Sequence, residues 1–220
     1  MEMEQKKTLR GELALLAVVL LNSFGVVLML YSGSGISAIS SVPYGFSEVF
    51  PAVSLGTWTY LFQGLLIFSL MLLRRKFVPA YLLSFLVGFA FSMMLDVYEL
   101  GIGILPASLP CRGVYFFGSY LVLCFGVALS NRCRMPIIPT DLFPRELSAI
   151  IRIPYPRVKI TFDVTCLTVT ALLTYSFLGG IRGLGIGTIA AAFTMGKTIG
   201  VIGDWIDRRV QFVSCLQDRM

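Results

Sequence analysis

The chain has 220 residues, of which 56% are hydrophobic and only 14% are charged, and its formal net charge is +6. Its mean hydropathy of +0.82 lies far above that of soluble domains, so a soluble globular class is excluded. The chain contains no histidine, which removes the commonest metal ligand and catalytic base. The five cysteines include no C-x-x-C pair, and no disulfide framework is expected.

Six apolar segments are long enough, or nearly so, to cross a membrane, which takes about 20 residues. They cover residues 12–31, 55–73, 78–96, 113–130, 158–178 and 184–204. We therefore predict an all-α integral membrane protein with six transmembrane helices, in contact with the lipid bilayer. The first apolar run is longer than a signal-peptide core, which favours its retention as a span.

The basic residues are distributed unevenly between the two sides that these spans define. With the N-terminus placed in the cytoplasm, the cytoplasmic flanks receive all but three of the 18 Lys and Arg residues. Arg112 and Arg182 fall outside, and Lys197 falls within a span. The positive-inside rule thus predicts that both termini are cytoplasmic. Basic residues scattered over short loops suit anionic lipid, and no nucleic-acid partner is expected.

A stripe of small residues that ends in aspartate occurs twice in the chain, at a four-residue step. The first stripe is Ser84, Gly88, Ser92 and Asp96, and the second is Ala192, Gly196, Gly200 and Asp204. Residues four apart share one face of a helix. Each stripe therefore predicts a smooth helix face on which another helix can pack closely in the membrane.

The stripes belong to a longer internal similarity. Residues 24–28 match 125–129, and the pair Phe62-Gln63 matches Phe162-Asp163 in the same order along the chain. We divide the chain into two three-helix repeats, residues 1–104 and 105–220. Because each half has an odd number of spans, the halves must cross the membrane in opposite senses. This inverted-topology repeat is typical of secondary transporters.

Two long connections occupy equivalent places in the halves, after the first and fourth spans. Residues 32–54 carry no Lys or Arg and remain apolar, whereas residues 131–156 are rich in proline and contain an amphipathic stretch. Each connection is predicted to be re-entrant or to lie at the membrane interface. Glu48, Asp141 and Glu146 lie in these connections and are candidates for an entry path.

Charged residues within the spans mark the predicted solute site. Lys197 is costly in a membrane and indicates function by default, with snorkelling to the interface as the alternative. Asp163 lies at a similar depth and is its expected partner, in a pair that is either functional or structural. The first-half equivalent of Asp163 is Gln63. The predicted substrate-binding set is Gln63, Asp163, Lys197, Gly88, Gly196 and Gly200.

Acidic residues at the membrane faces form a second set. Asp96 and Asp204 end their spans on opposite sides, as interfacial anchors or as part of a gate. The gate or entry candidates are Asp96, Asp204, Glu48 and Glu146. No nucleophile–base pair, metal cluster or catalytic carboxylate pair is found. We expect no catalytic residue, no metal, no cofactor and no enzymatic activity.

Glycine patterns at two helix starts carry a family resemblance. They are Ser-Leu-Gly-Thr-Trp at 54–58 and Gly-Leu-Gly-Ile-Gly-Thr at 183–188. With its glycine-broken helices ending in acidic residues, most of the chain resembles the YczE/YitT group of bacterial multi-pass membrane proteins. That group carries a Gly-Pro-Arg-Asp-like turn, for which this chain has Pro139-Thr140-Asp141 or Pro144-Arg145-Glu146. The resemblance implies a bacterial inner membrane and suggests transport, but supplies no substrate.

The leading functional hypothesis is a small permease that moves a small-molecule solute through a site between the two repeats. The positive charge of Lys197 favours a solute with an anionic group. Two alternatives remain open. One is a substrate-binding membrane subunit of a larger uptake system, which would work with an ATPase module, and the other is a non-transporting accessory protein. A homo-oligomer is also left open.

Overall fold

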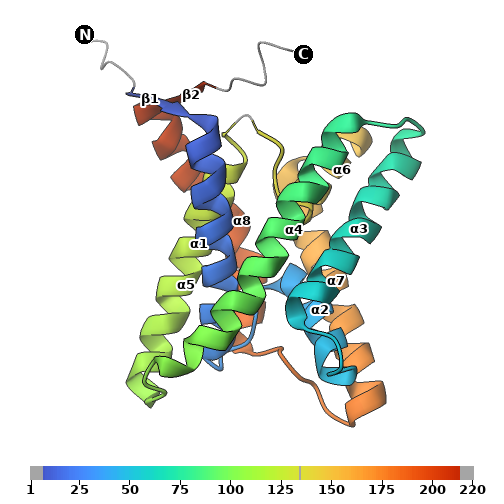
Figure 1. The fold of residues 1–220 in the computed structure, drawn as a ribbon, viewed down its shortest axis with the longest axis vertical. Coiled ribbons are helices and arrows are strands. Elements are labelled where there is room, and N and C mark those ends of the chain that lie inside the picture. Colours follow the sequence, from blue (N-terminus) through green and yellow to red (C-terminus); the bar gives the residue numbers. More distant parts are fainter. Residues whose placement is uncertain (1–6, 134, 214–220) are drawn as a thin grey trace.

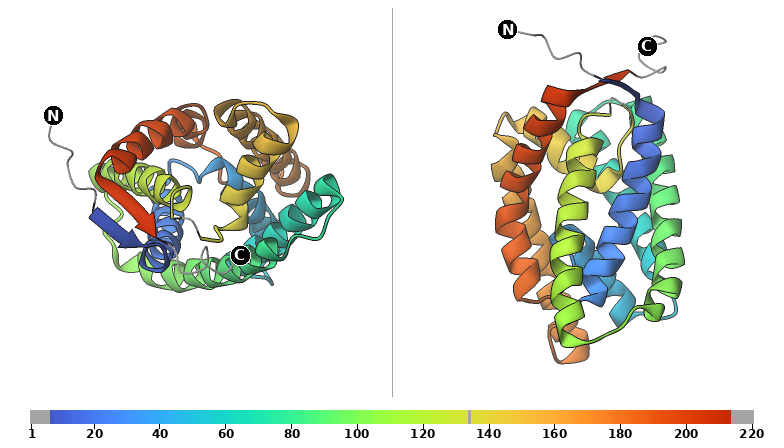
Figure 2. Two further views of the ribbon diagram at one scale, coloured as in Figure 1. Left: turned by 90° about the horizontal axis from the view of Figure 1, so that it is seen from above. Right: turned by 90° about the vertical axis from the view of Figure 1, so that its left-hand side faces the viewer.

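The fold is all-α apart from one pair of short strands, in a computed structural model that describes residues 7–133 and 135–213. Six helices in this part of the chain are long and apolar enough to span a membrane, which confirms the predicted fold class. They are α1 (Gly11–Tyr31), α3 (Leu55–Arg74), α4 (Pro79–Gly101), α5 (Leu109–Ser130), α7 (Tyr155–Leu178) and α8 (Ile186–Arg209). They surround the centre of the molecule when it is viewed along the bundle (Figure 2). A short 3-10 turn, Ile102–Ile104, extends α4.

Local signals explain where several of these helices begin and end. Proline occupies the first positions of α4, α5 and α7, where its missing N–H group is no loss. Helix α7 ends at Gly179, whose φ of 68° is the left-handed conformation that glycine adopts without steric penalty.

Two further helices lie in the two long connections. Helix α2 (Ala38–Val49) follows α1, and α6 (Pro139–Ile151) follows α5. Helix α2 packs against α3, α7 and α8, while α6 packs against α3, α4 and α7. Both therefore lie among the long helices (Figure 2), with α6 nearer the end that carries the termini and α2 nearer the opposite end (Figure 1). Their N-terminal halves are largely buried, so these connections are folded into the bundle.

The helix contacts follow one regular scheme. Helices α1 and α5 pack on each other, α4 packs on α1 as α8 packs on α5, and α3 packs on α4 as α7 packs on α8. The short helices obey the same rule, because α2 contacts α3, α7 and α8 while α6 contacts α7, α3 and α4. If α1–α4 are exchanged in order with α5–α8, each principal pair of contacting helices becomes another pair that is also in contact.

Two glycines allow α1 and α5 to approach closely. A Cβ atom at Gly25 would lie 2.9 Å from the side chain of Leu123, and one at Gly126 would lie 1.9 Å from Oδ1 of Asn22. Asn22 and Leu123 each precede the glycine of their own helix by three residues. The contact is therefore reciprocal, and small residues bring the two helix backbones together, as in other membrane bundles.

The two small-residue stripes have different surroundings. On α4, Ser84 and Ser92 are buried, and a Cβ atom at Gly88 would lie 2.0 Å from Oε1 of Gln63 on α3. This stripe packs closely, as predicted. On α8, no described atom outside the glycine's local helix lies within 4 Å of an added Cβ at Gly196 or Gly200. Ala192 and Gly196 are buried, whereas Gly200 is exposed. The predicted close packing against the glycines of this second stripe is therefore not found among the described residues.

A pair of parallel strands joins the two ends of the described chain. Strand β1 (Lys7–Arg10) pairs with β2 (Val210–Val213), in the register Lys7 to Val210 and Arg10 to Val213. The chain thus enters α1 and leaves α8 on the same side of the bundle (Figure 1), as an even number of spans requires. Nothing in the sequence analysis anticipated this pairing.

Candidate functional site

A cavity of about 50 Å³ lies at the centre of the bundle. That volume suffices for a few water molecules or a small polar group. Its lining includes the start of both short helices, with Ser37 and Ser40 from α2 and Thr140 and Asp141 from α6. The first N–H groups of a helix have no partner within the helix, and its N-terminus carries a partial positive charge. The cavity thus receives two helix N-termini, one from each half of the chain.

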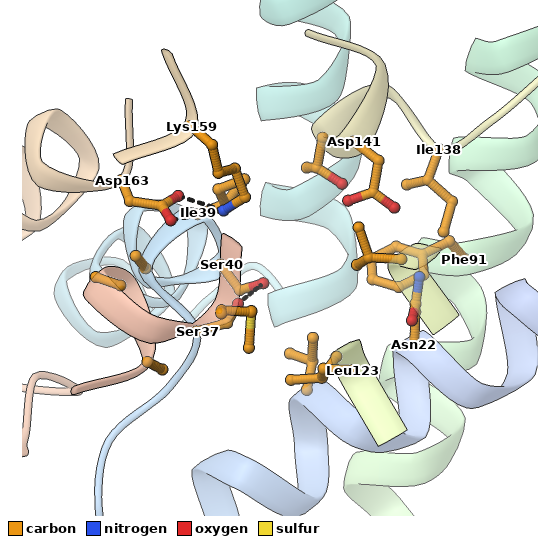
Figure 3. Close-up of a pocket in the computed structure, with 17 residues that line it drawn as sticks. Asn22, Ser37, Ile39, Ser40, Phe91, Leu123, Ile138, Asp141, Lys159 and Asp163 are labelled. Carbon is orange, nitrogen blue, oxygen red and sulfur yellow. Dashed lines mark hydrogen bonds and ion pairs between the residues drawn. The ribbon is translucent and has the colours of Figure 1, made fainter. Parts of the chain in front are cut away.

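A buried ion pair lines the same cavity. Nζ of Lys159 lies 2.6 Å from both carboxylate oxygens of Asp163, one turn further along α7. The two side chains are only 6% and 2% exposed. Burial of either charge alone would be strongly unfavourable, whereas the pair can be tolerated because each charge compensates the other. Figure 3 shows this pair on one side of the cavity and Asp141 on another.

Lys197 is not the partner of Asp163. It is exposed on α8, two residues from Met195 and two from Ile199, which are both buried. At about 100° per residue, Lys197 therefore lies on the opposite face of the helix from the packed side. The expected Lys197–Asp163 pair is replaced by Lys159–Asp163.

The sequence analysis missed Lys159 because it treated this residue as part of the cytoplasmic flank. Helix α7 begins at Tyr155, so Lys159 already lies within the helix. A signal was present, because Lys159 and Asp163 are four residues apart and share a helix face. The predicted span 158–178 already contains both residues, so their spacing alone was enough to indicate the pair.

Asp141 is the second carboxylate of the cavity. The residue is 8% exposed, and its Oδ2 atom has no hydrogen-bond partner among the described residues. Burial raises the pKa of Asp141 to about 6, against the opposing effect of Lys159 and Arg145, because an apolar environment disfavours the charged form. The sequence had placed Asp141 only on an entry path, whereas it lines the cavity itself.

Asn22 on α1 provides a polar group at another side of the cavity. It is 4% exposed, and its Oδ1 atom packs against Gly126. Its amide nitrogen is directed toward the side of the cavity where Asp141 lies (Figure 3). The sequence analysis did not select Asn22, although a polar amide in the middle of a strongly apolar span is a usable signal.

Gln63 lies next to the cavity wall. It is fully buried, and neither its Oε1 nor its Nε2 atom has a hydrogen-bond partner in the described chain. The side chain packs between α3, Gly88 on α4 and the start of α6, since an added Cβ at Gly88 would meet both Gln63 and Pro139. Gln63 and Gly88 are thus brought together near α6, whereas Gly196 and Gly200 lie away from them.

Two of the gate and entry candidates make contacts between helices. Asp96 accepts hydrogen bonds from the N–H of Gly56 at 2.7 Å and from the hydroxyl of Ser54 at 2.8 Å, so it caps the N-terminus of α3. Glu146 on α6 accepts from the Tyr81 hydroxyl at 2.8 Å and pairs with Arg74. These two carboxylates join neighbouring helices.

The other two candidates are less constrained. The side chain of Asp204 is 78% exposed and lies 4.0 Å from Arg132. Glu48 is partly exposed in the last turn of α2. Among residues 7–133 and 135–213, no group of three or more Cys, Asp or Glu residues could hold a metal ion. A role for Asp204 or Glu48 in gating stays a prediction.

The comparison with known proteins gives a family but no characterised relative. No curated protein and no solved structure matches the chain. The family model that does match carries neither the YczE nor the YitT name, so that resemblance stays a prediction. Its match extends from residue 9 to residue 204, which includes all six long helices except the last residues of α8. The chain belongs to the family of unknown function DUF6198.

Proposed function

We propose that this protein is a membrane transporter for a small anionic solute, which binds in the central cavity between two inverted three-helix repeats. The regular scheme of helix contacts supports the repeat, because each principal pair has a counterpart in the other half. In inverted-repeat transporters the solute site lies between the repeats near the middle of the membrane. A catalytic function is not part of the proposal.

The observation that carries the proposal is the convergence of two helix N-termini on one cavity. Helices α2 and α6 come from different halves, and the first residues of both line the same space. Interrupted helices of transporters use their N-termini in this way to hold anionic groups. Lys159 brings an ammonium group to the wall, where it is paired with Asp163. In place of Lys197, the two helix N-termini are therefore the groups that favour an anionic solute.

The orientation of the chain in the membrane and the kind of membrane are proposed from the sequence. The excess of Lys and Arg in the flanks on the side of the termini supports a cytoplasmic position for both termini. The family resemblance suggests a bacterial inner membrane.

One observation favours a second role, that of a membrane subunit in a larger assembly. Gly200, the last glycine of the second stripe, is exposed on α8, and no described atom outside its local helix lies within 4 Å of an added Cβ there. An exposed glycine on a span is a place where another helix can pack. A second copy of the chain or the membrane part of an ATPase-driven system would fit there. Co-purification of an ATPase module would favour this role.

Binding and uptake measurements test the proposal. The purified protein is heated in detergent in sodium nitrate, formate and chloride, because a ligand that binds only the folded state raises its stability. Uptake of radiolabelled formate and chloride into proteoliposomes then tests transport, with empty liposomes as the baseline. We expect stabilisation and uptake for at least one of these anions.

Two variants provide the specificity control. The double variant Lys159→Met/Asp163→Asn removes the buried pair without leaving one charge alone, and it should reduce anion binding and uptake. Lys197→Met removes an exposed lysine and should leave both unchanged. The proposed function would be rejected if none of the three anions stabilised the protein and neither formate nor chloride were taken up. Binding without uptake would instead support a substrate-binding subunit.

A further inference from the structure

Asp141 lines the same cavity as the helix N-termini that would hold an anion. Asp141 is in the first turn of α6, and its Oδ2 atom has no partner in the part of the chain that the structure describes. The side chain and the amide of Asn22 line the same small space. An anion that entered this space would lie beside a carboxylate.

The positive charges nearby are already engaged. Lys159 donates to both oxygens of Asp163, so this pair contributes no net charge. Arg145, one turn further along α6, is 40% exposed and lies 3.8 Å from Glu146. Arg74 and Tyr81 from α3 and α4 also contact Glu146. Among the described residues, Asp141 therefore has no counterion of its own.

The other described groups around Asp141 supply no further positive charge. Tyr155 and Asp163 on α7 lie close enough to Asp141 to interact with it, and neither carries a positive charge. Ser130 on α5 and Gln63 on α3 are buried and uncharged. With Asp141 ionised, the side chains of the cavity sum to one negative charge. A second anion would then be repelled by a carboxylate in a medium where screening is weak.

We infer that Asp141 is a proton-binding site, and that the cavity takes one proton on this carboxylate together with one small monovalent anion. The inference rests on the proposed function. The added proton neutralises Asp141 and the anion restores one negative charge, so the net charge of the cavity does not change. The new O–H group of Asp141 donates to the anion. The first N–H groups of α2, the N–H of Thr140 on α6 and the Asn22 amide supply the other donors, since Pro139 has no N–H and the N–H of Asp141 donates to Ile138.

The pH range of this coupling follows from the burial of Asp141. Its pKa is raised to about 6, so the carboxyl is mostly protonated at pH 5 and mostly ionised at pH 8. Since the anion binds the protonated form, its affinity should change by no more than about twofold below pH 6. Above that value the affinity should fall about tenfold per pH unit, because binding and protonation are linked.

Anion titrations at several pH values test the inference. The apparent Kd for sodium nitrate, formate and chloride is measured from thermal stabilisation in detergent between pH 5 and pH 8. For the native chain, Kd should rise about 50-fold between pH 6 and pH 8. For Asp141→Asn, which keeps the shape and is always neutral, Kd should be independent of pH. Glu99→Gln, which neutralises an exposed carboxylate on α4, should behave like the native chain.

A second measurement needs no variant. Addition of the anion to the native protein in weakly buffered solution at pH 7.5 should take up about one proton per anion bound. Anion binding that is equally tight at pH 5 and pH 8, without proton uptake, would overturn the inference and leave the proposed anion site standing. Stabilisation by sodium or ammonium ions at pH 8 would overturn it too, because Asp141 would then serve a cation. Failure of every anion to bind at any pH would reject the anion site itself.

Discussion

Gly25 and Gly126 hold equivalent positions at the crossing of α1 and α5, each against the residue that lies three positions before the other glycine. Gly25 meets Leu123, and Gly126 meets Asn22. Because the two glycines also correspond in the internal sequence similarity, this crossing is where an axis relating the two halves would pass. The same crossing positions Asn22 at the cavity.

Gly126→Ala tests this contact. The added methyl would lie 1.9 Å from Oδ1 of Asn22, so we expect a loss of about 1–3 kcal/mol from overpacking. Thermal unfolding in detergent measures the change. Gly118→Ala on the same helix is the matched control, because nothing lies within 4 Å of its added methyl. If the double variant Asn22→Ala/Gly126→Ala were no more stable than Gly126→Ala, the Asn22 contact would not be the cause.

The two stripe glycines provide a second matched pair. Gly88→Ala should destabilise the protein by about 1–3 kcal/mol, because its methyl would collide with the buried Gln63 and with Pro139. Gly196→Ala should have little effect on a single chain, since the space beside it is open. Chemical unfolding of both variants in detergent checks the difference. Equal losses would mean that the second stripe is also closely packed.

A third prediction concerns the cap of α3. Asp96→Ala removes the acceptors for the Gly56 N–H and the Ser54 hydroxyl, and should reduce the free energy of unfolding by about 1–2 kcal/mol. Asp204→Ala changes the corresponding residue of the second half. It should stay within about 0.5 kcal/mol, because Asp204 is exposed and has one long contact with Arg132. A larger effect of Asp204→Ala on unfolding would contradict this assignment.

The matched residues of the two halves show which features the sequence could and could not reveal. The six spans were predictable because a membrane helix needs only length and hydropathy, which are local properties. The apolar character of residues 32–54 also indicated a segment that is not freely solvated. The face that each helix buries was harder, because a lipid-facing residue and a core residue are both apolar. The stripes on α4 and α8 look alike, yet an added Cβ would meet a neighbouring helix at Gly88 and would meet no described atom at Gly196 or Gly200.

The candidate site could also be predicted only in part. Asp163 and Gln63 stood out because polar groups inside a span are costly. Asp141 was undervalued because it lies in a connection, and only the fold brings the start of α6 to the centre of the bundle. Lys159 was overlooked because it is the second residue of the predicted span 158–178 and was counted with the cytoplasmic flank. Basic residues at a span's end usually lie in such a flank.

The burial of Asp141 predicts a pH-dependent effect of its replacement on stability. Because its pKa is raised from 3.8 to about 6, the folded state binds the proton more tightly than the unfolded state. The stability from this proton is complete below about pH 4 and is lost as the pH rises through 6. Asp141→Asn should therefore stabilise the protein at pH 7.5 by up to about 3 kcal/mol and much less at pH 4. Unfolding at both pH values checks this, and an effect independent of pH would point to packing alone.

The buried pair gives the sharpest contrast between two lysines. Lys159→Met leaves Asp163 buried without its cation, and should cost about 3–5 kcal/mol of stability. Adding Asp163→Asn removes the unpaired charge, so the double variant should recover most of that loss. Lys197→Met, on the exposed face of α8, should be close to neutral. The four proteins are compared by thermal unfolding in detergent at one pH.

If Lys159→Met and the double variant were equally unstable, the loss would come from the lysine stem and not from an uncompensated charge. If Lys197→Met were the more damaging change, the partner of Asp163 would have to be sought on α8 after all.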